Sequence, residues 1–380
     1  MKHVMGNYQE LAASLADQRT YPLSYLSEDW SDVAVWQTIG RAAALDALSY
    51  RPRACPLNAA VGRKYERDGL IIEHVSYDQP AGPRTEGIFL YPIDRPSGKL
   101  PAIVALHDHG GFKYYGKEKL VDLDNEPGIL TRFKRESYEG RSWATELAKR
   151  GYAVFVPDVF LWGSRRMTAE QVTEPYSSAV TRHEPGTESY IEAYNQFAGE
   201  HEALIAKTLY LAGATWTGIM AYEDRRAVDY LLTRPEVDGG RIGCGGLSGG
   251  GLRTIYLAGL DDRISCAVCV GFMSTNKETI ANRIKWHTWM FHVPQLSQLL
   301  DLPDILSLHG KKPVMVQYDI DDPLWTIQGQ RDSDKRLADI YGKMGAADRY
   351  CGKFYPGPHK FDMEMQEDAF NWFDQWLSVK

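Results

Sequence analysis

The sequence is poor in cysteine, in long apolar runs and in basic charge. Its five cysteines among 380 residues are an odd, scattered set, which excludes a disulfide framework. Its apolar stretches stay far below the roughly 18 residues that a membrane-spanning helix needs. Lys and Arg number 43 and Asp and Glu number 50, so the net charge is −7 at pH 7. We therefore expect no nucleic-acid binding and no membrane binding. The N-terminus lacks an apolar signal core, and few cysteines suit a reducing compartment, so we expect a cytoplasmic location.

Two of the cysteines, Cys266 and Cys269, form a CxxC pair that could indicate a redox centre or half of a zinc site. They lie in an apolar run that is typical of a β-strand. Side chains three positions apart in a strand point to opposite faces of the sheet. We therefore interpret the pair as two buried thiols.

The spacing of apolar residues changes near residue 65. Residues 1–65 have helical spacing and predict a helical N-terminal extension. Over 66–380, β-rich runs alternate with amphipathic helices, and the central runs are almost wholly apolar. This alternation predicts an α/β domain with a mostly parallel sheet flanked by helices. Two stretches interrupt it: 162–213, which we interpret as a lid, and 274–312, a second insertion rich in Trp, His and Pro.

The segment Gly246-Leu247-Ser248-Gly249-Gly250 follows a predicted strand and precedes a predicted helix. A GxSxG pattern in this setting is typical of a nucleophile elbow, in which a sharp turn exposes the serine and small neighbours let the backbones pack closely. The alternative is a glycine-rich turn that happens to contain a serine. We predict that Ser248 is a nucleophile.

A serine nucleophile needs a histidine base and an orienting acid, which in this topology follow the serine in the order acid, then histidine. His359 lies in a loop between the last predicted strand and the last helix, where it could reach the serine. Asp319, Asp321 and Asp322 follow the preceding predicted strand. We predict that His359 is the base and Asp322 the acid, with Asp319 as the alternative acid.

The acyl-transfer intermediate also needs two N–H donors for its oxyanion. Gly249, directly after the nucleophile, is one candidate. The loop Leu106-His107-Asp108-His109-Gly110-Gly111 follows an early strand and offers the second donor. His107 and His109 could instead be a metal pair, but no third ligand lies nearby in the sequence. We predict no metal and no cofactor.

These motifs together resemble the α/β-hydrolases, and within them the dienelactone hydrolase and acetyl xylan esterase-like branch. The similar stretches are LHDHGG, GYAVFVPDVFLWGSR, the elbow with its flanking strand and helix, the segment leading to DIDDPLW, and FYPGPHKF, which together span about 70–380. The resemblance implies Ser248, Asp322 and His359 as a catalytic triad. It also implies Gly249 and His109 as oxyanion donors. Asp108 departs from the pattern, since a glycine is usual at its position.

The expected activity is hydrolysis of a small-molecule carboxylic ester through an acyl-enzyme, without cofactor or metal. A serine peptidase or amidase, a carbon–carbon bond hydrolase and an acyltransferase use the same residues and remain alternatives, and a non-enzymatic scaffold is a further one. Trp162, Arg165, Trp286 and Trp289 lie in or beside the two insertions and are candidates for substrate binding, although lid packing and structural ion pairs explain them equally.

The N-terminal helices carry an apolar stripe that needs burial, comprising Leu11, Leu15, Val33, Val35, Trp36 and Ile39. The stripe could pack on the core of its own chain, on the lid or on a second subunit. Since isologous dimers are the commonest oligomers, we expect a homo-oligomer, most simply a dimer.

Overall fold

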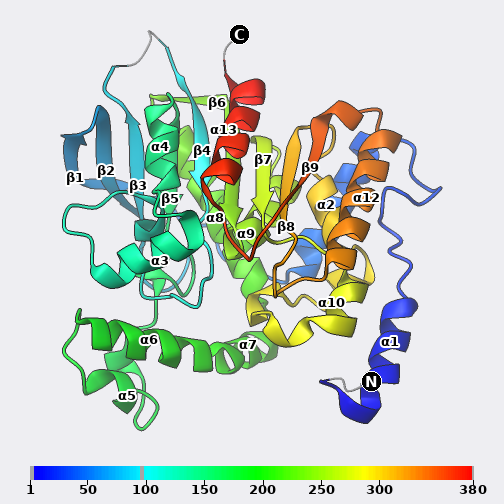
Figure 1. The fold of residues 1–380 in the computed structure, drawn as a ribbon, viewed down its shortest axis with the longest axis horizontal. Coiled ribbons are helices and arrows are strands. Elements are labelled where there is room, and N and C mark those ends of the chain that lie inside the picture. The colour runs from blue at the N-terminus through cyan, green and yellow to red at the C-terminus, as the bar shows by residue number, and fades with distance from the viewer. Residues whose placement is uncertain (1–3, 95–97, 379–380) are drawn as a thin grey trace.

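The computed structural model describes residues 4–94 and 98–378, and these form a nine-stranded sheet with helices on both faces (Figure 1). The strand order is β1-β2-β3-β5-β4-β6-β7-β8-β9. The strands are β1 (Ala60–Arg67), β2 (Leu70–Tyr77), β3 (Thr85–Pro92), β4 (Leu100–Ala105), β5 (Ala153–Pro157), β6 (Val237–Leu247), β7 (Ile264–Val270), β8 (Val314–Asp319) and β9 (Tyr350–Tyr355). The pairs β1–β2, β2–β3 and β3–β5 are antiparallel, and the other neighbours in this order are parallel. The predicted mostly parallel sheet is therefore confirmed.

Two hydrophobic clusters cover the two faces of the sheet. One cluster includes side chains of α2 (Val33–Ala47), α8 (Trp216–Leu232), α9 (Gly249–Leu260), α11 (Leu302–Ser307) and α12 (Ile327–Lys343). The other includes side chains of α3 (Gly128–Tyr138), α4 (Trp143–Lys149) and α13 (Met363–Leu377). Cys269 belongs to the first cluster and Cys266 to the second, and both are buried free thiols. The alternation of side chains along β7 thus separates the CxxC pair, as predicted.

The helices of the first insertion and α10 (Asn276–Asn282) of the second lie below the sheet in Figure 1, at the carboxyl ends of the central strands. The first contains α5 (Ser178–Thr181), α6 (Glu188–Glu200) and α7 (Glu202–Leu211), and the second contains α10 and α11. Helices α6 and α7 are separate, because the chain leaves the helix at His201. The described residues also form short 3₁₀ turns, which are Gly6–Tyr8, Lys117–Leu120, Gly163–Arg165, Ala169–Gln171, Ile284–Trp286, Trp289–Phe291, Leu296–Gln298 and Ala347–Arg349. No helix in residues 4–94 and 98–378 combines the length and apolarity needed to span a membrane.

The N-terminal segment is only partly helical. It forms α1 (Gln9–Asp17) and α2, but β1 begins at Ala60, inside the range predicted to be helical. β1 is an edge strand with largely exposed side chains, so it lacks the apolar alternation that would reveal it. Trp36 of α2 is fully buried, whereas Leu11, Leu15, Val35 and Ile39 are exposed. α2 is therefore part of the core, and much of the predicted stripe is not covered by this chain.

Candidate active site

Ser248 lies between the end of β6 and the first residue of α9, in a strained turn with φ 59° and ψ −118°. A non-glycine residue at positive φ is uncommon and often marks a functional site. Gly246 and Gly250 flank it, and a Cβ built on either would lie 2.1 Å from the carbonyl oxygen of Leu106. Only glycine fits these two positions. The predicted strand–turn–helix context of Ser248 is therefore present.

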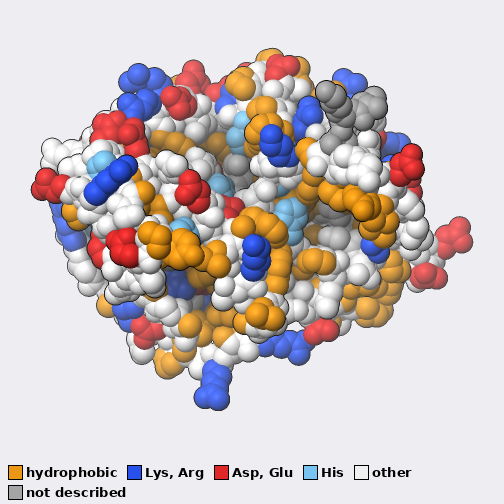
Figure 2. Space-filling view, turned by 90° about the horizontal axis from the view of Figure 1, so that it is seen from below, with side chains coloured by type: hydrophobic (Ala, Val, Ile, Leu, Met, Phe, Trp, Pro, Cys, Tyr) orange, Lys and Arg blue, Asp and Glu red, His pale blue; other side chains and the backbone are white. Residues whose placement is uncertain are grey.

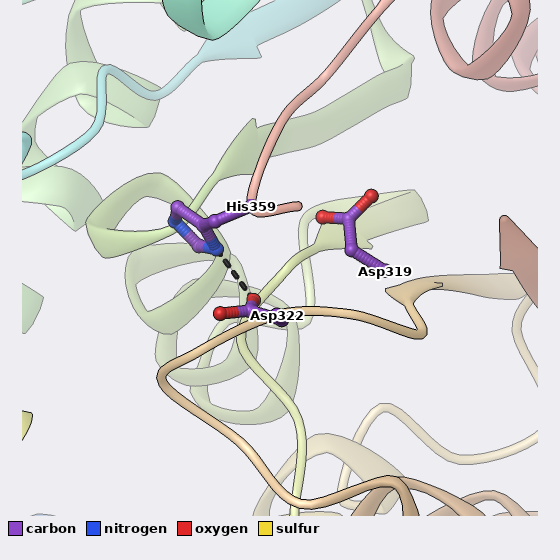
Figure 3. Close-up of side chains that lie close together, drawn as sticks. All are labelled: Asp319, Asp322 and His359. Atoms are coloured by element: carbon purple, nitrogen blue, oxygen red, sulfur yellow. Dashed lines mark hydrogen bonds and ion pairs between the residues drawn. The ribbon is translucent and has the colours of Figure 1, made fainter. Parts of the chain in front are cut away.

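His359 and Asp322 lie on different loops at the carboxyl edge of the sheet and point toward one another (Figure 3). Nδ1 of His359 lies 2.6 Å from Oδ2 of Asp322. The other carboxylate oxygen of Asp322 accepts a hydrogen bond from the backbone N–H of Leu324 at 2.8 Å. Asp322 is buried and His359 is partly exposed. Asp322 therefore holds the imidazole in a fixed orientation with Nε2 directed away from the carboxylate.

Asp319, the alternative acid, binds a different group. Its Oδ2 accepts a hydrogen bond from the backbone N–H of Lys360 at 3.1 Å. The carboxylate thereby fixes the residue that follows His359. Burial raises the pKa of Asp319 to about 7. Asp319 thus supports the histidine loop and makes no hydrogen bond to the imidazole within the described residues.

The imidazole of His359 has a raised pKa. Burial by itself would lower that pKa, but the hydrogen bond and the negative charge of Asp322 outweigh it. The charges of Asp319 and Asp108 act in the same direction. A more basic imidazole is a stronger proton acceptor, which suits a general base.

The end of β7 brings the elbow and the histidine loop together. The backbone N–H of Ser248 donates to the carbonyl oxygen of Val270 at 2.8 Å. A Cβ built on the next residue, Gly271, would lie 3.0 Å from Cε1 of His359 and 3.2 Å from the Leu247 side chain. Nε2 of His359 is buried and has no hydrogen-bond partner among the described residues. His359 and Ser248 therefore both adjoin the end of β7, and no hydrogen bond joins Nε2 of His359 to the Ser248 hydroxyl within the described residues.

The loop after β4 also packs on the elbow. A Cβ built on Gly249 would lie 2.6 Å from the backbone nitrogen of His109. Gly249 begins α9, so its N–H has no partner within the helix. The backbone N–H groups of Gly249 and His109, the two predicted oxyanion donors, are thus neighbours.

Asp108, the departure from the family pattern, anchors this loop. Its carboxylate accepts a hydrogen bond from the Tyr138 hydroxyl and pairs with the Lys119 ammonium at 3.1 Å. The same ammonium donates to the backbone carbonyl oxygens of Asp108 and His109. All three side chains are buried. An aspartate replaces the usual glycine because a buried lysine and a buried tyrosine satisfy it.

The histidine pair of this loop is engaged by protein groups. Nδ1 of His107 lies 3.0 Å from the carbonyl oxygen of Asp108, and Nε2 of His109 lies 2.6 Å from Oε1 of Glu202. Among the described residues, the one group of three side chains spaced to hold a metal ion is Asp319, Asp322 and His359, whose ligand atoms lie within 4.8 Å of one another. A metal there would require His359 to give up its hydrogen bond to Asp322.

Glu202 and Lys113 complete the surroundings of His109, and neither was predicted from the sequence. The Glu202 carboxylate contacts both the His109 ring and the Lys113 ammonium. The side chains of Glu202 and Lys113 are both buried. They are separated from one another by 89 positions along the chain. No local sequence pattern at either residue indicates this contact.

Of the predicted substrate-binding residues, Trp162 and Arg165 are buried. The indole N–H of Trp162 donates to the carbonyl oxygen of His109 at 3.2 Å, and its ring lies under the Lys113 ammonium. The Arg165 guanidinium pairs with Glu223 and donates to the carbonyl oxygens of Ala81 and Pro83. Trp162 thus lies beside the loop after β4, and the Arg165 guanidinium is engaged in a buried ion pair.

Trp286 and Trp289 of the second insertion lie at the surface, with 59% and 37% of their area exposed.

Figure 2 views the face at the carboxyl ends of the strands, where histidine side chains surround a recess near the middle. A pocket of about 300 Å³ beside the loop after β4 is lined by Gly110, Gly111 and side chains of α3 and α6. A second pocket of about 360 Å³ lies between α1 and the second insertion. No triad candidate lines either pocket, but the smaller one adjoins the loop that carries His109.

Comparison with known proteins finds similarity in sequence and in fold. No family model matches it. The Bacillus subtilis (strain 168) protein named "Putative hydrolase YtaP" is 26% identical over 329 residues, which cover 86% of this chain and 95% of that protein.

Three solved structures align over most of the chain. The crystal structure of a putative acetyl xylan esterase from Bacteroides fragilis NCTC 9343 has a TM-score of 0.70 at 17% identity, covering 93% of this chain and 83% of that one. A glucuronoyl esterase from Solibacter usitatus has a TM-score of 0.58 at 15% identity, covering 90% and 93%. An acetyl xylan esterase from Paenibacillus sp. R4 has a TM-score of 0.53 at 17% identity, covering 96% and 99%. With the sheet order and the elbow, these likenesses confirm the predicted α/β-hydrolase fold.

Proposed function

We propose that this protein hydrolyses a carboxylic ester with Ser248 as nucleophile, His359 as base and Asp322 as orienting acid. One observation carries the proposal: the His359–Asp322 pair lies at the end of β7, against which the strained turn of Ser248 also packs. Ser248, Asp322 and His359 also follow one another along the chain in the order that this fold uses, which supports the proposal. The esterases among the similar structures support the same class of reaction.

In the first step the Ser248 hydroxyl oxygen attacks the ester carbonyl carbon while Nε2 of His359 takes the hydroxyl proton. The carbonyl oxygen becomes an oxyanion in a tetrahedral intermediate. The intermediate collapses, the carbon–oxygen bond to the alcohol breaks, and His359 returns the proton to the departing alcohol. An acyl-Ser248 ester remains.

In the second step a water molecule replaces the alcohol. His359 takes a proton from the water, whose oxygen attacks the acyl carbon. Collapse of the second tetrahedral intermediate releases the carboxylic acid and returns the proton to Ser248. During both steps Asp322 stabilises the imidazolium through its hydrogen bond to Nδ1.

The backbone N–H groups of Gly249 and His109 are proposed to bind the oxyanion in both intermediates. Their neighbouring positions support this role, since a Cβ on Gly249 would lie 2.6 Å from the nitrogen of His109. Donors fixed by backbone packing need no rearrangement when the negative charge develops.

We propose a small-molecule ester as the substrate, and an acetyl ester as its simplest form. The names of the similar acetyl xylan esterases support this choice. Amide and carbon–carbon bond hydrolysis use the same triad, so turnover of an acetyl ester should be compared with that of the matched acetamide and of a 1,3-diketone.

The test is replacement of the nucleophile. Ser248→Ala should lower hydrolysis of p-nitrophenyl acetate by several orders of magnitude and abolish labelling by a fluorophosphonate probe. Ser189→Ala, on the exposed surface of α6, is the matched control and should retain both. A Ser248→Ala protein that keeps most of its activity would contradict the proposal.

A further inference from the structure

The lid contributes one charged side chain to the immediate surroundings of the oxyanion loop. Glu202 is the first residue of α7, and its Oε1 lies 2.6 Å from Nε2 of His109. The backbone N–H of Gly111 donates to the other ring nitrogen, Nδ1, at 3.0 Å. Because Nδ1 accepts this bond, the ring proton lies on Nε2, which donates to Glu202. These two bonds together fix the tautomer and the plane of the ring. The Lys113 ammonium also lies 3.0 Å from Nε2.

Both carboxylate oxygens of Glu202 bind groups from other segments of the chain. Besides His109, Oε1 contacts the ammonium of Lys113, which lies within the loop after β4. Oε2 accepts hydrogen bonds from the Thr288 hydroxyl at 2.7 Å and from the backbone N–H of Trp289 at 3.4 Å, both in the second insertion. Glu202 thus joins the lid, the second insertion and the oxyanion loop at one point.

The surroundings of the Glu202 carboxylate keep it negatively charged. Glu202 is buried, which by itself would raise its pKa, but its bonds to His109 and the charge of Lys113 hold that pKa well below its usual range. Burial and the Lys113 ammonium lower the pKa of His109, so its ring stays neutral at neutral pH. Burial also lowers the pKa of Lys113 to about 8. The carboxylate is the counter-charge on which the buried ammonium depends.

We propose that Glu202 is a positioning residue of the esterase. It binds the imidazole of His109 and so holds the backbone N–H of the same residue beside Gly249, where the oxyanion forms. This inference rests on the proposed function, because it assigns a role in that reaction. It makes the oxyanion site dependent on the lid, since the oxyanion loop is held to α7 through this carboxylate.

The role predicts a particular kinetic change. Glu202→Ala should lower kcat for p-nitrophenyl acetate about 10- to 100-fold, less than loss of an oxyanion donor itself, and should leave KM within about threefold. A trifluoromethyl ketone, whose adduct with Ser248 carries an oxyanion, should bind more weakly by a similar factor. Glu202→Gln, which keeps the size of the side chain, is the second variant if the alanine protein does not fold. Glu200→Gln, exposed at the end of α6, is the control and should change neither quantity.

A double-mutant cycle separates positioning from general stabilisation of the lid. His109→Ala keeps the backbone N–H and removes the ring through which Glu202 acts. Adding Glu202→Ala to His109→Ala should therefore lower kcat by less than twofold further. The inference would be wrong if the two substitutions lowered kcat independently, so that their factors multiply in the double variant. It would also be wrong if Glu202→Ala left kcat unchanged.

Labelling distinguishes this failure from failure of the proposed function. If fluorophosphonate labels Ser248 in the wild-type and Glu202→Ala proteins and kcat is equal in both, the esterase mechanism stands and the role of Glu202 is wrong. If the wild-type protein is not labelled at Ser248, the proposed function fails and this inference fails with it.

Discussion

Nδ1 of His359 lies 2.6 Å from Oδ2 of Asp322, the third of three aspartates at and just after the end of β8. The first of them, Asp319, binds the backbone of Lys360 instead. Asp322→Asn should therefore lower kcat by about 10⁴, as the equivalent change does in serine proteases with the same triad, because the amide favours the wrong imidazole tautomer. Kinetics with p-nitrophenyl acetate measures this.

Asp319→Asn is the matched control for this prediction. It removes a neighbouring carboxylate that makes no hydrogen bond to the ring, so kcat at its optimum pH should fall by less than about tenfold. A larger loss in Asp319→Asn than in Asp322→Asn would mean that Asp319 orients the base.

The pH dependence of kcat/KM should report the raised pKa of His359. The base acts only when neutral, so kcat/KM should rise with pH through a midpoint above 6.5, the usual value for histidine. Asp319→Asn should move this midpoint to lower pH, because a negative charge that favours the imidazolium is lost. Since the pKa of Asp319 is about 7, that charge acts mainly above neutral pH. A midpoint that stays in place or moves upward in Asp319→Asn would contradict this reading.

Arg253 and Asp224 form a fully buried ion pair between α9 and α8, with Nη2 2.6 Å from Oδ1. Burial raises the pKa of Asp224, and Arg253 opposes this rise. Arg253→Met should lower the free energy of unfolding by about 3–5 kcal/mol, because it leaves a buried carboxylate without a partner. Urea denaturation measures the loss. Arg331→Met, exposed on α12, should change stability by less than about 0.5 kcal/mol.

Removal of residues before Val61 should destabilise the protein. Trp36 is buried, and Arg41 donates to the carbonyl oxygens of Gly259 and Leu308, so the shortened chain would expose an apolar face of the core. Circular dichroism on heating should show a lower Tm, or the shortened chain should aggregate. A chain that begins at Arg19 retains α2 and should be close to the full chain in stability. Equal stability of all three chains would contradict the assignment of α2 to the core.

The intact chain is proposed to form a dimer. This proposal is based on exposed apolar side chains of α1 and α2, which are Leu11, Leu15, Val35 and Ile39. Light scattering should give about twice the chain mass of 42.9 kDa. Val35→Ser with Ile39→Ser should favour the monomer, and a monomeric full-length protein would refute the proposal.

Features encoded by neighbouring residues could be predicted from the sequence. The elbow at Ser248 is visible because its glycines, strand and helix are contiguous, and the fold is visible because strands and helices alternate. Asp322 and His359 could be proposed because this fold fixes their order along the chain. β1 was missed because an edge strand with exposed side chains lacks an apolar pattern.

Contacts between distant segments could not be predicted. Glu202 lies 93 positions from His109, and nothing in either local sequence specifies their contact. Asp108 could be recognised as unusual, but its partners Lys119 and Tyr138 come from a turn and a helix whose placement only the folded chain defines. Such polar contacts depend on tertiary packing, which leaves no periodic signal in the sequence.

The carbonyl oxygen of Leu106 lies so close to Gly246 and Gly250 that the elbow and the strand before the oxyanion loop form one rigid block of main chain. The dimensions of this block are set by peptide groups, so replacement of side chains in the two insertions leaves them unchanged. Apart from Glu202 and the residues that bind it, the insertions can therefore diverge during evolution, or be randomised in the laboratory, without rebuilding this block. Libraries that seek new ester preferences should vary the side chains of α6, α10 and the turn Ile284–Trp286, and should keep Glu202 and the glycines around Ser248 constant.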